Sequence, residues 1–100
     1  ARRRLHERAV IVAAGEGWHP GVVGIVAGRL KDRYQRPAIV AGVDAGVAKG
    51  SARSISGVDI GAAIRAARAA GLLLAGGGHA MAAGLTADSQ RLGDLDAFLD

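Results

Sequence analysis

The sequence predicts an α/β domain in which helices flank a mixed, mainly parallel β-sheet. Residues 9–14 and 37–43 are continuous apolar runs rich in β-branched residues, which is typical of strands covered on both faces. The segment between them, residues 20–34, has helical periodicity, so the order is that of a right-handed crossover between parallel neighbours. No internal repeat, linker or shift in composition divides the 100 residues into two domains.

The first helix is expected to begin at Pro20, because proline suits the first turn of a helix, with His19 at the cap position. Its apolar stripe consists of Val22, Val23, Val26 and Leu30. A second face carries Gly21, Gly24 and Gly28. Because glycine inside a helix costs about 1 kcal/mol relative to alanine, we expect this face to approach a backbone closely, in the sheet or in another domain.

A candidate anion site follows in residues 48–54, which come after a loop at 44–47 and alternate as in a strand with one face in water. Side chains alternate along a strand, so Lys49, Ser51 and Arg53 are expected to project from the same side. Two positive charges and one hydroxyl in a row suit a phosphodiester. These residues are therefore predicted to bind phosphate.

The other elements are predicted from caps and apolar spacing. Asp59 is expected to cap a helix over residues 60–70, with Arg65 and Arg68 on its outer side and Gly71 at its end. Residues 85–87 predict a further strand, and residues 91–100 a closing helix. Residues 1–8 are charged and helix-compatible, so we interpret them as the end of a connecting helix and residues 9–100 as one domain.

Three consecutive glycines, Gly76, Gly77 and Gly78, precede His79 in the segment 72–86. Glycine loses more backbone entropy on ordering than any other residue, so this run indicates a place where a ligand touches the backbone. Residues 80–83 are expected to form a short helical turn whose N–H groups face the glycine loop and hold a phosphate. The alternative is a tight turn between two buried segments.

Composition narrows the classes of partner. Thirteen Lys and Arg against nine Asp and Glu give a formal net charge of +4, which suits a polyanion, although a compositional bias of the source genome would give the same excess. The chain has no cysteine, which excludes disulfides and thiolate metal sites and favours a cytoplasmic, reducing setting. No apolar run approaches the roughly 20 residues of a membrane span, so no membrane association is expected.

The chain offers binding groups without a catalytic set of its own. His6, His19 and His79 stand in unrelated contexts, and none pairs with a carboxylate at the spacing of metal ligands. A serine nucleophile elbow and a glycine-rich dinucleotide motif are absent as well. We therefore expect no metal site in this sequence.

Three segments in this order, WHPGVVGIVAGRL, KGSARS and GGGHAMAAGL, resemble the DHHA1 domain of the DHH phosphoesterase superfamily. Within it, the combination is similar to the RecJ single-strand-specific exonucleases over nearly the whole chain. The resemblance implies part of a 5′ to 3′ exonuclease of DNA repair and recombination, with single-stranded DNA as its partner. It also implies Mn or Mg ions held by a separate DHH domain of the same polypeptide, which this chain does not contain.

The resemblance further implies roles for individual residues. Ser51 and Arg53 match the positions that hold the terminal 5′ phosphate, and Lys49 is a further candidate for the backbone phosphates. Residues 76–79 match the tetrad that faces the metal site across the interdomain cleft. In that tetrad His79 is the catalytic candidate, near the scissile phosphate.

Two other interpretations stay open. One is a phosphodiesterase of the same superfamily that acts on short oligonucleotides or cyclic dinucleotides, against which the WHPG and KGSARS segments argue. The other is a non-catalytic nucleic-acid-binding appendage like the DHHA1 module of alanyl-tRNA synthetases. Trp18 and His19 lie in a matching segment without a defined role, and Trp18 is interpreted as a packing or interface residue rather than a base-stacking one.

Overall fold

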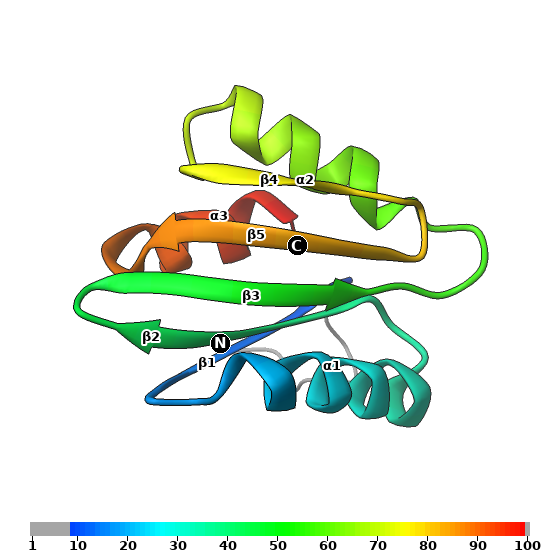
Figure 1. The fold of residues 1–100 in the computed structure, drawn as a ribbon. Coiled ribbons are helices and arrows are strands. Elements are labelled where there is room, and N and C mark those ends of the chain that lie inside the picture. The colour runs from blue at the N-terminus through cyan, green and yellow to red at the C-terminus, as the bar shows by residue number, and fades with distance from the viewer. Residues whose placement is uncertain (1–8, 100) are drawn as a thin grey trace, which may run out of the picture.

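The structure is a computed structural model that describes residues 9–99. The elements are β1 (Ile11–Glu16), α1 (Pro20–Tyr34), β2 (Ala38–Asp44), β3 (Val47–Arg53), α2 (Ile60–Ala69), β4 (Ala75–Gly78), β5 (Ala82–Asp88), the 3-10 helix η2 (Ser89–Arg91) and α3 (Leu92–Leu99). In these residues they form one five-stranded sheet with helices on both faces (Figure 1), which confirms the predicted α/β class. The connecting helix expected at residues 1–8 lies outside the described residues.

The sheet is mixed but mainly antiparallel, so the expectation of a mainly parallel sheet is wrong. Its strand order is β1-β2-β3-β5-β4, in which β1 and β2 run parallel and the three other neighbouring pairs run antiparallel. The connection from β2 to β3 explains the difference, because it is a tight turn at Ala45 and Gly46 with φ angles of 51° and 78°. A turn this short cannot contain a crossover helix and joins antiparallel strands.

Helix α1 has the bounds and the cap that the sequence predicts. The Nδ1 atom of His19 accepts a hydrogen bond from the Gly21 N–H at 3.0 Å, so the side chain replaces a partner that the first turn lacks. Val23 and Ala27 are buried against Val40 of β2, which fixes α1 on one face of the sheet.

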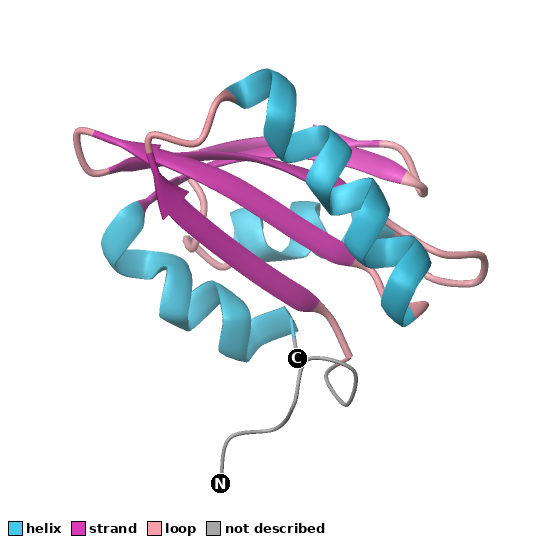
Figure 2. Ribbon diagram, turned by 90° about the horizontal axis from the view of Figure 1, so that it is seen from below, coloured by secondary structure: helices cyan, strands magenta, loops and turns pink. Residues whose placement is uncertain are grey.

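The two faces of the sheet are covered unequally. Helix α1 packs on β2 and β3, whereas α2 packs on β4 and β5 from the opposite face and also contacts α3. Figure 1 shows α2 and α3 behind β4 and β5, with no helix in front of these two strands, and Figure 2 shows α1 lying across the other half of the sheet. The front of β5 and β4 is therefore a face that no described helix covers.

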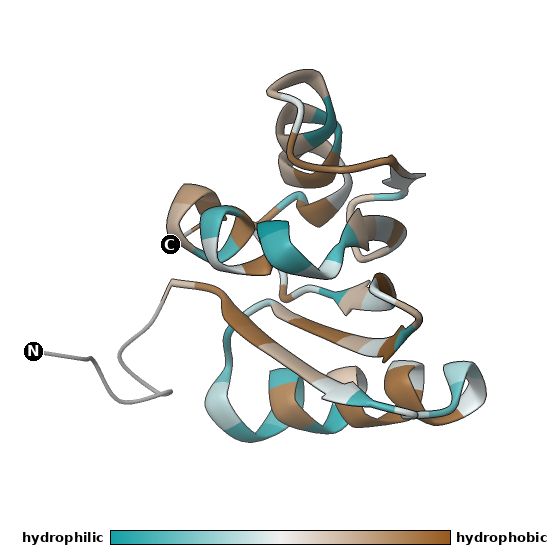
Figure 3. Ribbon diagram, turned by 90° about the vertical axis from the view of Figure 1, so that its left-hand side faces the viewer, coloured by the Kyte–Doolittle hydropathy of each residue, from teal (hydrophilic) through white to brown (hydrophobic). Residues whose placement is uncertain are grey.

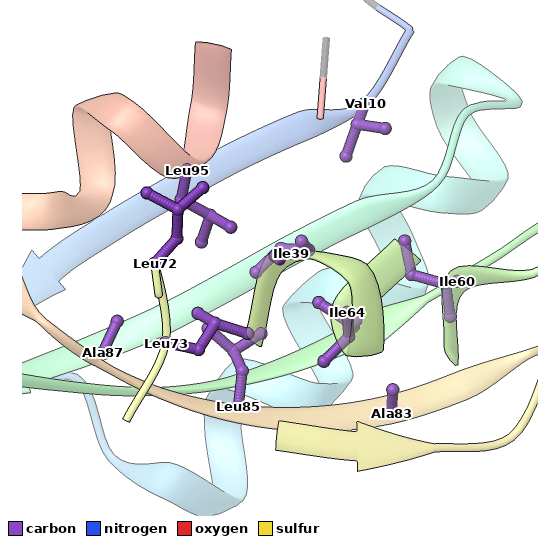
Figure 4. Packing of buried hydrophobic residues seen from close by; sticks show 12 residues of the cluster. Val10, Ile39, Ile60, Ile64, Leu72, Leu73, Ala83, Leu85, Ala87 and Leu95 are labelled. Carbon is purple, nitrogen blue, oxygen red and sulfur yellow. The ribbon is translucent and has the colours of Figure 1, made fainter. Parts of the chain in front are cut away.

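The main hydrophobic core lies between the sheet and helices α2 and α3 (Figure 4). Its largest fully buried side chains are Ile39, Ile60, Ile64 and Leu95. Coloured by hydropathy, β1 is hydrophobic at its start, where it leaves the grey trace, and becomes hydrophilic at its end (Figure 3). Within residues 9–99, no helix combines the length and the apolar character needed to cross a membrane.

The glycine segment is a strand and not a loop before a helical turn. Residues 76–78 belong to β4, residues 82–83 belong to β5, and residues 79–81 form the hairpin turn between them. The helical turn expected at residues 80–83 is therefore wrong. In β5 the side chains of Ala83, Leu85 and Ala87 are buried on alternate positions, and this burial outweighs the helical preference of the alanines.

Candidate nucleic-acid interface

Lys49, Ser51 and Arg53 form a polar row along β3. The row faces α1, because a Cβ atom built on Gly24 of α1 would lie 3.1 Å from Arg53 Nη2 and 3.5 Å from Ser51 Oγ. Ser51 and Arg53 are half-buried beside the helix, and Lys49 is exposed. The alternation along β3 thus gives the arrangement that the sequence predicts, and it accounts for the glycine at position 24.

Most hydrogen-bond donors of the polar row have no partner within the described part of the chain. Arg53 donates from Nη1 to the carbonyl oxygen of its neighbour Ala52 at 2.8 Å, which leaves its other N–H groups available. Among residues 9–99, the Ser51 hydroxyl and the Lys49 ammonium have no hydrogen bond or ion pair. An anion at this row would therefore gain charge-assisted hydrogen bonds without displacing existing ones.

A side-chain-free patch lies beside the polar row on the same face. Ser51 is opposite Gly84 in the sheet register, and Gly84 is opposite Gly77, so these residues share one face. A Cβ atom on Gly77 would meet nothing within 4 Å, and one on Gly84 only the Gly50 carbonyl oxygen at 3.8 Å. Neighbouring strands are about 4.8 Å apart, which puts Ser51 and Gly77 roughly 10 Å from each other. We call Gly77 and Gly84 the bare patch.

The three consecutive glycines have three different environments. A Cβ atom on Gly76 would lie 2.8 Å from Ile64 Cγ2, so this residue faces the core under α2. Gly78 has φ 153°, and a Cβ there would lie 2.5 Å from the Cα of Ala83. Gly77 alone of the three faces open space. The prediction that all three present backbone to a ligand therefore has direct geometric support only at Gly77.

His79 is exposed in the hairpin turn at the Arg53 end of the polar row. Its N–H donates to the carbonyl oxygen of Ala82 at 2.8 Å, and Ala82 is the register partner of Arg53. The turn is held by the Ile60 N–H, which donates to the Ala80 carbonyl oxygen at 2.9 Å. The fold therefore brings His79 and Arg53 to the same end of the sheet.

Ser54, the second serine of the KGSARS segment, is a structural residue. Its side chain is fully buried, and its hydroxyl donates to the Val58 carbonyl oxygen at 2.6 Å. Its N–H donates to the Met81 carbonyl oxygen at 2.9 Å. Ser54 thus ties the loop before α2 to the hairpin turn that carries His79.

Arg65 and Arg68, which the sequence predicts on the outer side of the helix, contact the glycine strand. Arg65 Nη1 donates to the Gly78 carbonyl oxygen at 3.0 Å, and Arg68 Nη1 donates to that of Gly76 at 3.5 Å. The two arginines are one turn apart on α2, and the two carbonyl groups are alternate ones on β4. The one signal in the sequence was the spacing of three residues between the two arginines, which puts them on the same side of α2.

We expect the double substitution Arg65→Ala and Arg68→Ala to lower the free energy of unfolding by about 1 kcal/mol, because both bonds are exposed and one is long. For a domain of this size that corresponds to a fall in Tm of about 5 °C, measurable by calorimetry. The double substitution Arg29→Ala and Arg33→Ala, which removes two positive charges from exposed positions of α1, serves as the control. An unchanged Tm in the double variant would show that the two bonds do not hold β4.

The described residues do not fit a metal site. In residues 9–99, no group of three or more His, Cys, Asp or Glu side chains is arranged so that it could hold a metal ion. The chemistry of the polar row and the bare patch is that of anion binding.

Comparison with known proteins identifies the family. The sequence profile of the DHHA1 domain matches residues 7–100. The chain belongs to the DHHA1 domain family. Over 94% of its length, this DHHA1 domain is similar to the single-stranded-DNA-specific exonuclease RecJ of Bacillus subtilis (strain 168), with 48% identity, and covers 12% of that protein. The resemblance predicted from the three sequence segments is thereby confirmed.

Solved structures agree with this assignment. Crystal structures of RecJ from Thermus thermophilus, in complex with Mg2+ and with Mn2+, match 93% of the DHHA1 domain with a TM-score of 0.81 and 35% identity, and the match covers 14% and 13% of those chains. The C-Ala domain of alanyl-tRNA synthetase from Aquifex aeolicus matches with a TM-score of 0.71 and 16% identity, over 97% of this chain and 96% of that one. The second likeness shows the fold alone.

Proposed function

We propose that this DHHA1 domain is the substrate-binding part of a 5′ to 3′ exonuclease specific for single-stranded DNA. The observation that carries the proposal is that the polar row and the bare patch share one face of the sheet, where a phosphodiester can reach both. The relatives support it, because the RecJ proteins that match most of this chain are single-stranded-DNA-specific exonucleases. The chain spans only 12% to 15% of those two proteins.

The proposed mechanism of this domain is positioning. Ser51 and Arg53 hold the 5′ phosphate, Lys49 meets a further phosphate, and the glycines of β4 let the strand approach the backbone near the scissile bond. His79 lies at the end of the sheet where the reacting phosphate is held, and it faces the cutting domain. Fixing the strand in this way supplies the orientation that an in-line displacement requires.

We also propose a division of labour within a longer polypeptide. Residues 1–8 end the connecting helix, residues 9–100 form the substrate domain, and a DHH domain of the same polypeptide holds Mn or Mg ions. The RecJ structures with Mg2+ and Mn2+ support the choice of ions. A cytoplasmic location is part of the proposal, since the RecJ relatives come from bacteria, whose DNA lies in the cytoplasm.

The alternatives differ in what they require of the polypeptide. A non-catalytic appendage needs no cutting domain, and a cyclic-dinucleotide phosphodiesterase needs no preference for 5′ phosphate. The likeness to the C-Ala domain does not favour the first of these, because its 16% identity carries only the fold.

We expect the 100-residue chain alone to hydrolyse no single-stranded DNA with Mn2+ present, and the complete polypeptide that carries it to release nucleotides from the 5′ end. The measurement is digestion of strands labelled at either end, with and without a 5′ phosphate. Activity of a clean preparation of the short chain would overturn the division of labour. An inactive complete polypeptide that still binds nucleic acid would favour the appendage.

A further inference from the structure

A hollow of about 640 Å³ lies at the Lys49 end of the polar row, away from His79. It opens where β1 and β2 end and α1 begins. Its lining includes Trp18, His19, Gly42, Asp44 and Lys49. Pockets for small molecules generally measure roughly 300 to 1,000 Å³, so the hollow has the size for a ligand as large as a nucleotide.

Trp18 gives the hollow an aromatic wall. Its ring lies over Gly15 of β1, at the position that a Cβ atom there would occupy, and the backbone of Trp18 lies likewise against Gly42 of β2. Gly15 and Gly42 are register partners, so a pair of glycines on neighbouring strands seats the tryptophan. The side chain nevertheless stays 44% exposed, which leaves ring surface available to a planar group.

The polar groups of the hollow complement a nucleotide. Because His19 Nδ1 accepts the hydrogen bond of the Gly21 N–H, the neutral ring carries its proton on Nε2, which becomes a donor. The Lys49 ammonium and the Asp44 carboxylate have no hydrogen bond or ion pair among residues 9–99. The hollow therefore combines a stacking surface, a cation, a neutral donor and an acceptor.

We propose that this hollow is a binding pocket for a nucleoside monophosphate, with the base on Trp18 and the phosphate on Lys49 and the Nε2–H of His19. Asp44 accepts from a sugar hydroxyl or a base amine. The pocket shares Lys49 with the polar row but extends away from the pair that holds the 5′ phosphate: along β3, Lys49 is about 7 Å from Ser51 and about 13 Å from Arg53. It needs no second domain, and it goes beyond the proposed positioning of the strand.

An apolar protein segment fits the hollow poorly. Such a segment would remove Lys49 and Asp44 from water without giving them partners, and burying unpaired charges is strongly unfavourable. A nucleotide offers a partner to each of them and a ring to the tryptophan, and base stacking on an aromatic side chain tolerates any base.

Trp18 is the only tryptophan of the chain, so its fluorescence reports on the pocket directly. We expect deoxyadenosine monophosphate to quench this fluorescence saturably in the 100-residue chain. Deoxyribose 5-phosphate, which lacks the base, should bind at least about ten-fold more weakly, because it loses the stacking contribution. Equal binding of the two compounds, or no saturable quenching at millimolar nucleotide, would overturn the proposal.

Two variants assign the polar contacts. Lys49→Ala should weaken binding of the nucleotide by about ten-fold, since a charge-assisted contact is lost. His19→Asn keeps a residue that caps helices well but removes the Nε2 donor, and should weaken binding about three-fold. Arg33→Ala is the control for lost charge. If Lys49→Ala binds as tightly as the parent chain, the pocket is wrong, whereas the strand-binding proposal, which is tested at Arg53, would stand.

Discussion

Arg53→Ala is expected to weaken the binding of a 5′-phosphorylated single strand by about ten-fold or more, because each charge-assisted hydrogen bond to phosphate contributes roughly 1.5 to 3 kcal/mol. The folded domain should change little. Arg53 is only half-buried, and its one hydrogen bond among residues 9–99 runs to the carbonyl oxygen of the preceding residue. Fluorescence anisotropy of a labelled oligonucleotide measures the affinity, and the Tm of the variant checks the fold.

The matched control for Arg53 is Arg33→Ala. Arg33 follows Gly24 by nine residues, about two and a half turns of α1, so it lies on the side of the helix away from the polar row. Both variants lose one positive charge, and a purely long-range effect of net charge would weaken binding equally in both. The same strand without a 5′ phosphate isolates the terminal group. Equal losses in the two variants, or a loss that ignores the 5′ phosphate, would contradict the role of Arg53.

Elements with local signals were predictable from the sequence. His19 and Pro20 define the start of α1, and the Asp59 side chain accepts from the Ala62 N–H at 3.0 Å, as the cap of α2 requires. The alternation that puts Ser51 and Arg53 on one face is equally local. Strand direction was not predictable, because it depends on whether residues 44–47 form a crossover or a hairpin. The tight turn there includes Ala45 at φ 51°, a left-handed conformation that is uncommon for residues other than glycine.

The residues proposed for the site could be named from the sequence, whereas their arrangement could not. A run of glycines shows where side chains are absent, but it is compatible with either a loop or a strand. Pairing of β4 with β5 decides for the strand, and this pairing is set by the core contacts of Leu85 and Ala87. The hydrogen bonds from Arg65 and Arg68 to β4 could not be predicted either, because they depend on where β4 lies relative to α2.

Gly78→Ala is expected to lower the free energy of unfolding by roughly 2 to 4 kcal/mol, the second large effect. An alanine at φ 153° is strained, and its Cβ would lie 2.5 Å from the Cα of Ala83, a backbone atom that cannot turn aside. The corresponding fall in Tm is about 10 to 20 °C. Calorimetry of the 100-residue chain measures it, and a shift below a few degrees would show that the turn relaxes around the new side chain.

Gly77→Val separates function from stability in the same strand. A Cβ at Gly77 meets nothing within 4 Å and its φ is not positive, so the free energy of unfolding should change by less than about 0.5 kcal/mol. The new side chain would nevertheless stand on the bare patch beside Gly84, where it keeps a phosphodiester away from the backbone. We expect the affinity for a single strand to fall about ten-fold, because the side chain would hold the strand away from this face of the sheet and remove its close van der Waals contacts there. If the variant is stable and binds normally, the single-stranded DNA does not cross the bare patch. This conclusion would hold whether or not Arg53 binds the 5′ phosphate.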